Sequence, residues 1–202
     1  GSGSRAGKME QHNAGKPQVD QALCRGCHAC AKACGQNAID FGDAGKALID
    51  HGRCVGCGRC LAHCNFDAIQ NEDYNANDEL NRRMAEYAKA VVQHRPNFHI
   101  SLVIDISPNC DCHDENDAPI IPDVGMFASF DPVALDQACA DACNNMPVLP
   151  KSQLADNLAA PGVCSCGDHF IDSAPTTDWR VCLEHAEKIG LGTSEYELIE
   201  VK

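Results

Sequence analysis

The chain has 202 residues, of which 44% are hydrophobic and 5% aromatic, enough for one or two small domains with a core. It carries 16 Lys and Arg against 29 Asp and Glu, a net charge of −13. This charge argues against a nucleic-acid partner, whose phosphates require a basic surface. No apolar run approaches the roughly 20 residues of a membrane span, and no signal peptide is visible, so we expect a cytoplasmic protein.

Residues 1–17 are polar and rich in Gly and Lys, and we interpret them as a tail or linker. An internal repeat follows, in which residues 19–40 match residues 49–70 at an offset of 30. Each repeat is too short to bury a core alone, so the pair is expected to form one domain, residues 18–72. The remaining residues, 73–202, are predicted to form a second domain.

Eight of the 15 cysteines lie in two runs with the spacing C-x2-C-x2-C-x3-C, which is typical of 4Fe–4S ligands. Three thiolates on a tight loop reach one cube, and the fourth winds away toward the other. We therefore predict two 4Fe–4S clusters with crossed ligands. The first cluster takes Cys24, Cys27, Cys30 and Cys64, and the second takes Cys54, Cys57, Cys60 and Cys34.

Two zinc sites and a disulfide framework are the alternatives for these cysteines. Zinc motifs seldom place four cysteines in eleven residues twice, and an odd number of cysteines fits a full disulfide set poorly. We favour the clusters. Gly26 and Gly56 lie within the loops, where a missing side chain lets backbone amides approach sulfur.

Residues 19–70 resemble the bacterial two-cluster ferredoxin family, which implies a ferredoxin-like fold with an internal pseudo-two-fold repeat. The family usually has Pro after each fourth Cys, whereas Gly35 and Asn65 stand here. Proline is not a ligand, so this departure concerns loop stiffness.

A wider resemblance rests on the strings SRAGKMEQH (4–12), AEYA (85–88), CDC (110–112), FDPVALD (130–136) and IGLG (189–192). They are similar to the uncharacterised iron–sulfur proteins grouped as domain of unknown function 362. In that family a longer region precedes the first string, so the resemblance implies that this chain is a C-terminal fragment.

In the second domain, apolar residues at helical spacing predict a helix over 77–95, whose Leu80, Met84, Tyr87 and Val91 pack against a strand over 98–106. Asp131 followed by Pro132 predicts a helix to about residue 144. Residues 146–178 are expected to be mostly loop, 179–189 a helix, and 195–201 a final strand. Alternating helices and strands favour a small α/β domain, and the whole chain is predicted to be α+β.

Seven cysteines lie outside the two runs. Cys139, Cys143 and Cys182 fall on predicted helices, where we favour core packing over metal binding. Cys110, Cys112 and His113 form a possible zinc or iron site, to which Cys164, Cys166 and His169 add a second C-x-C pattern. Two reduced dithiols in loops are the alternative.

The favoured function is electron transfer by two clusters, with a redox partner that presents a basic docking patch. One alternative is that the clusters feed a redox enzyme whose active site lies in residues 73–202 or in a missing N-terminal part. Another is that they only stabilise the fold. The sequence contains no recognisable catalytic constellation, so whether the protein is an enzyme stays open. His28 and His63 both flank ligands of the first cluster, although histidines at such positions also serve merely as solvated surface residues.

Overall fold

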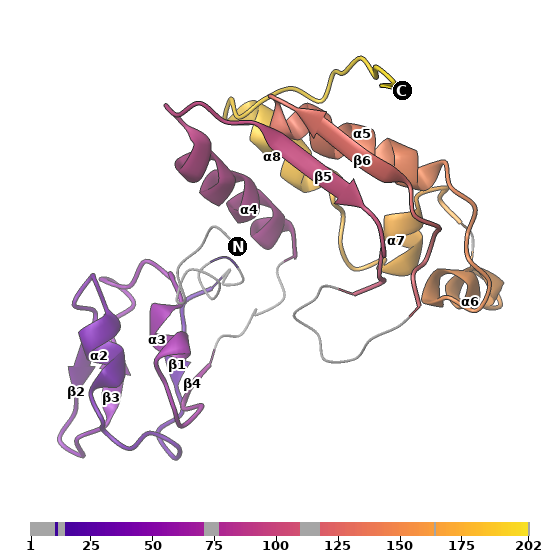
Figure 1. Cartoon of the computed structure of the whole chain (residues 1–202). Coiled ribbons are helices and arrows are strands. Elements are labelled where there is room, and N and C mark those ends of the chain that lie inside the picture. Colours follow the sequence, from indigo (N-terminus) through magenta and orange to yellow (C-terminus); the bar gives the residue numbers. More distant parts are fainter. Residues whose placement is uncertain (1–10, 12–14, 71–76, 110–117, 164, 202) are drawn as a thin grey trace. The chain divides into compact units, whose positions relative to one another are not determined.

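The computed structural model describes residues 11, 15–70, 77–109, 118–163 and 165–201 (Figure 1). The chain divides between Tyr87 and Ala88 into two compact units. In the described residues the strands form three two-stranded antiparallel sheets, and with the helices they make an α+β protein. Within these ranges no helix is long and apolar enough to cross a membrane.

The first unit contains two short antiparallel strand pairs and two one-turn helices. Strand β1 (Gln18–Val19) pairs with β4 (Ile69–Gln70), and β2 (Ile39–Phe41) pairs with β3 (Ala47–Ile49). Helix α2 (Ala29–Ala33) precedes β2, and α3 (Arg59–Ala62) precedes β4. The core between these elements is small and consists of cysteines and aliphatic side chains: Cys24, Cys30, Ile39, Ala47, Cys60, Ala68 and Ile69.

The two halves of this unit repeat each other's contacts at the offset of 30. Lys46 Nζ donates to the carbonyl oxygen of Gln21, and Lys16 Nζ donates to that of His51. Gln21 Nε2 donates to the Ala47 carbonyl at 2.8 Å. In the equivalent place, His51 Nε2 lies 3.0 Å from the Pro17 carbonyl.

Two glycine contacts extend the same correspondence. A Cβ atom on Gly26 would collide with the carbonyl oxygen of Gly45, and one on Gly56 would lie 2.8 Å from that of Gly15. Both loop glycines have left-handed backbones, with φ of 66° and 72°. The repeat therefore begins at least at Gly15, four residues before the sequence comparison placed it.

Helix α4 (Asn77–Val92) ends three residues before the predicted end. Its predicted apolar face is partly wrong, because Met84 is 40% exposed and Val91 44%. The buried positions are Asn81 and Ala85, one turn apart on a different stripe of the helix.

The second unit is built on strands β5 (His99–Val103) and β6 (Gly125–Ser129), with Ile100 opposite Ala128 and Leu102 opposite Met126. These strands are antiparallel, so the predicted α/β domain is wrong in class and the unit is α+β like the first. Helix α5 (Pro132–Asn144) packs on the pair, and α8 (Arg180–Lys188) packs on α5 (Figure 1). The core consists of Val103, Ile120, Ile121, Leu135, Cys139, Cys143 and Leu154.

Helix α5 starts where the sequence predicts. Asp131 Oδ1 accepts the amides of Val133 at 2.8 Å and Ala134 at 3.1 Å, while Oδ2 accepts the Thr193 amide at 2.9 Å. The carboxylate thus joins the helix start to the C-terminal segment.

The region expected to be mostly loop has most of its described residues outside helices and strands, but it also contains α6 (Gln153–Ala159) and α7 (His169–Ser173), capped by the side chains of Ser152 and Asp168. Residues 195–201 form no strand, because they pair with no neighbour in the described part of the chain.

One face of the β5–β6 pair is apolar and open to solvent. Ile100, Leu102 and Met126 are 61%, 63% and 69% exposed. Their strand neighbours Val103 and Phe127, on the opposite face, pack into the core.

Candidate functional site

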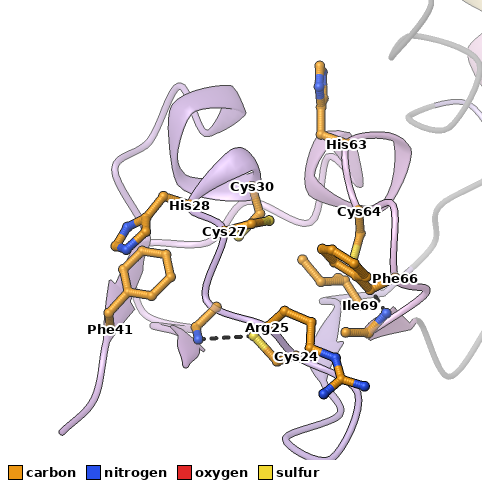
Figure 2. A pocket seen from close by; sticks show the side chains of 12 residues that line it. Cys24, Arg25, Cys27, His28, Cys30, Phe41, His63, Cys64, Phe66 and Ile69 are labelled. Atoms are coloured by element: carbon orange, nitrogen blue, oxygen red, sulfur yellow. Dashed lines mark hydrogen bonds between the residues drawn. The ribbon is translucent and has the colours of Figure 1, made fainter. Parts of the chain in front are cut away.

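The eight motif cysteines line two small cavities of similar size in the first unit. Each cavity combines three cysteines of one motif with the fourth cysteine of the other. The first is lined by Cys24, Cys27, Cys30 and Cys64, and the second by Cys54, Cys57, Cys60 and Cys34. Figure 2 shows the first cavity, with the four cysteine side chains around one space.

Each cavity is bounded on one side by the start of a one-turn helix. His28 and Gly58 precede α2 and α3 with left-handed backbones, at φ of 62° and 71°. This turn brings the third cysteine of each motif, Cys30 or Cys60, into the helix and into the core.

Backbone amides donate to the sulfur atoms at matched places in the two cavities. The Ala68 amide lies 3.3 Å from Cys64 Sγ, and the Ala38 amide lies 3.3 Å from Cys34 Sγ. Such bonds stabilise negative charge on sulfur, which is what a thiolate ligand requires.

A further amide approaches the first cysteine of each motif. The Ala47 amide lies 3.4 Å from Cys24 Sγ, a bond drawn in Figure 2, and the Gly56 amide lies 3.4 Å from Cys54 Sγ. The donors differ in origin, because Ala47 is in strand β3 and Gly56 is in the cysteine loop itself.

The buried thiols resist ionisation. Burial raises the pKa of Cys60 to about 12, with a contribution from the neighbouring Cys57 and Cys54. Burial also raises the pKa of Cys30. Four thiolates therefore gather in either cavity only when a cation compensates their charge.

Cationic and aromatic side chains differ between the cavities. Arg25, His28 and His63 line the first, where the His28 ring stacks on Phe41 with centroids 3.7 Å apart. Arg59 lines the second. The sequence prediction that both histidines flank the first group of cysteines agrees with this lining.

No group of three or more His, Cys, Asp or Glu side chains in the described ranges converges as a site for a single ion. A cubane holds its four ligands farther apart than one metal ion does, since each thiolate binds a different iron. The donor sets of the two cavities fit such a group: each has four thiols, amides directed at sulfur, and walls in which aliphatic side chains accompany one arginine.

The other predicted cysteine site lies largely outside the described residues, which omit Cys110, Cys112, His113 and Cys164. Cys166 is exposed, with Sγ 3.3 Å from Asp172 Oδ1. His169 Nε2 lies 2.8 Å from the Met146 carbonyl.

Cys139, Cys143 and Cys182 lie on helices. Cys139 and Cys143 belong to the core of the second unit, as predicted, and burial raises the pKa of Cys143 to about 11. Cys182 is half-buried on α8.

Sequence reasoning missed Gly15, Lys16 and Pro17, which it assigned to a tail. Pro17 is fully buried and lines the second cavity, as Ala47 lines the first. The missed signal is the match of Gly15-Lys16-Pro17 to Gly45-Lys46-Ala47, which extends the repeat at the same offset.

Comparison with models of protein families gives a match over most of the chain. The family model described as domain of unknown function (DUF362) matches residues 1–141. Searches of curated proteins and of solved structures found no match. The chain therefore belongs to the DUF362 family.

Proposed function

We propose that the first unit binds two 4Fe–4S clusters and that the protein serves in electron transfer. The observation that carries this proposal is the pair of four-cysteine cavities, each completed by the fourth cysteine of the other motif. This exchange is the ligand pattern of two-cluster ferredoxins. When bound, each cluster would supply a one-electron redox centre.

The chain's own residues supply the binding and the electrostatics. The eight cysteines would hold the iron as thiolates, and the amides of Ala38 and Ala68, which donate to Cys34 and Cys64, would stabilise the charged sulfur atoms. The raised pKa of Cys60 makes assembly dependent on pH, because its proton must leave when iron binds. A reducing, cytoplasmic setting keeps these thiols available.

A redox partner with a basic docking patch is part of the proposal, since the whole chain has a net charge of −13. The charge is unevenly distributed, however. Residues 15–70 contain six Lys and Arg against five Asp and Glu, so the acidic surplus lies elsewhere in the chain. We therefore expect a basic partner to be attracted mainly by residues outside the cysteine domain.

The first test is the iron and acid-labile sulfide content of anaerobically purified protein. About eight irons per chain agree with two 4Fe–4S clusters. About twelve irons, or zinc in addition, would point to a further site at the C-x-C cysteines. Reversible one-electron reduction supports electron transfer, whereas clusters that decompose on reduction favour a purely structural role.

The crossed assignment is tested by two double variants that differ in one residue. Cys34→Ala with Cys54→Ala removes two ligands of the same proposed centre, so about half of the iron should remain. Cys34→Ala with Cys24→Ala damages both centres and should lose nearly all of it. The reverse result would show that each motif holds its own cluster.

A further inference from the structure

A surface pocket in the second unit gathers cations within an acidic part of the chain. It lies at the C-terminal end of α4 and is lined there by Lys89, His94 and Arg95. Residues 88–202 contain six Lys and Arg against 18 Asp and Glu. Two of these six cations line the pocket, whereas none of the described carboxylates does. The pocket therefore attracts an anion in a unit that otherwise repels one.

Asp131 is the carboxylate closest in sequence to the pocket, because its neighbours Phe130 and Pro132 both line the wall. Its oxygens already accept the amides of Val133 and Thr193, at 2.8 and 2.9 Å. These donors compensate part of its negative charge, so it weakens the attraction for an anion less than a free carboxylate would.

The donors left open in the pocket are side chains. The amides of Gly190 and Leu191, which also line it, already donate to carbonyl oxygens of α8. The side chains of His94 and Arg95 form no hydrogen bond or ion pair within the described ranges. Lys89 Nζ donates to the carbonyl oxygen at the end of α8, which leaves further protons of its ammonium group for a ligand.

His94 occupies a backbone position that favours glycine. It is the second residue after α4 and has a left-handed φ of 61°. A histidine at such a place carries backbone strain, and it puts an imidazole into the pocket wall that a glycine would lack.

Another part of the wall is aromatic and open to solvent. Phe130 lines the pocket and is 78% exposed. Its ring meets that of Phe98 edge-on, with centroids 4.9 Å apart and an angle of 61° between the planes. This contact holds the Phe130 ring in place, and its exposed surface offers a planar ligand a partner for stacking.

We propose that this pocket binds a nucleotide, whose phosphate contacts Arg95, His94 and Lys89 and whose base stacks on Phe130. The guanidinium group presents paired N–H donors that match phosphate oxygens. Stacking on an aromatic ring accepts any base, since every base has a flat face. The pocket lies entirely in the second unit, so this proposal does not depend on iron–sulfur clusters in the first.

The test is isothermal titration calorimetry of the anaerobically purified full chain with adenosine monophosphate. We expect a dissociation constant below about 1 mM. Inorganic phosphate and adenosine, which each carry part of the ligand, should bind at least about tenfold more weakly. Arg95→Gln should weaken binding of the nucleotide about tenfold or more, and Phe130→Ala about fivefold or more.

The control is Lys151→Gln, which removes a positive charge of the same unit outside the pocket lining and should bind as the parent does. Absence of binding, or equal binding by the parent and Arg95→Gln, would overturn the proposal. Phosphate or adenosine that binds as tightly as the nucleotide would overturn it as well. If Arg95→Gln fails to fold, as judged by circular dichroism, Phe130→Ala decides the question. Iron and sulfide content, measured on the same samples, tests the proposed function separately.

Discussion

Asp178 and Arg180 form a two-point contact at the start of α8. Arg180 Nε and Nη2 each lie 2.8 Å from an oxygen of the Asp178 carboxylate, and the Arg180 amide donates to Oδ1 at 3.0 Å. The guanidinium, together with this amide, lowers the pKa of Asp178 below its ordinary value. A carboxyl group with a lowered pKa in the folded state stabilises the fold above the pKa it has when unfolded, about 3.9.

We therefore expect Asp178→Asn to lower the urea midpoint of the second unit at pH 7. The difference from the parent should shrink as pH falls from about 5 to 3, since the parental carboxylate then becomes protonated. Trp179, the single tryptophan, lies beside the substitution and reports unfolding by fluorescence. A difference that is constant across this pH range would contradict the charge-based explanation.

The positions of single residues could be predicted where they depend on the spacing of nearby residues in the sequence. The eight motif cysteines and the core positions of Cys139 and Cys143 follow from spacing alone. The bond from the Ala47 amide to Cys24 and the place of Pro17 in the second cavity do not, because these residues come near the cysteines only when the chain folds.

Helix α5 depends on a cap that serves two segments. Asp131→Ala removes acceptors for Val133, Ala134 and Thr193, so we expect a loss of about 1–2 kcal/mol in the free energy of unfolding. Asp131→Ser keeps a good cap but is too short to hold Thr193, and should lose less. Urea denaturation followed by Trp179 fluorescence measures both. An alanine variant as stable as the parent would show that the cap contributes nothing.

Helices and strands could be predicted where short sequence patterns mark their ends. Asp131-Pro132 marks the start of α5 correctly, and α8 lies within the predicted range 179–189, followed by Gly190 with φ of 72°. Helices α6 and α7 were missed because their one or two turns lie among Pro, Gly and Ser residues that indicate loops. The predicted last strand is absent for another reason. Alternating polar and apolar residues are typical of a strand, but a strand forms only where a neighbouring strand is present to hydrogen-bond with it.

At the scale of the whole molecule, acidic charge is combined with an open apolar sheet face. The sequence has a pI of about 4.9, so charge repulsion fades as pH approaches 5. Exposed apolar patches then favour association. We expect light scattering of the parent to rise between about pH 6 and 5, and to rise less for a Leu102→Gln, Met126→Gln double variant.

The control for this experiment is Leu48→Gln, which removes an exposed leucine from the first unit instead. It should scatter as the parent does. Equal scattering by all three proteins would show that the β5–β6 face is not the surface that associates.

The exchange of fourth cysteines between the cavities has a consequence for synthesis of the chain. The first cavity begins with Cys24 but is complete only with Cys64, forty residues later. The second uses Pro17 and Cys34 from the part made first and waits for Cys54, Cys57 and Cys60. Neither cavity has all four of its cysteines until Cys60, the third cysteine of the second motif, has been translated. Both close in the same short interval, and until then every thiol made so far stays open to oxidants and to competing metals.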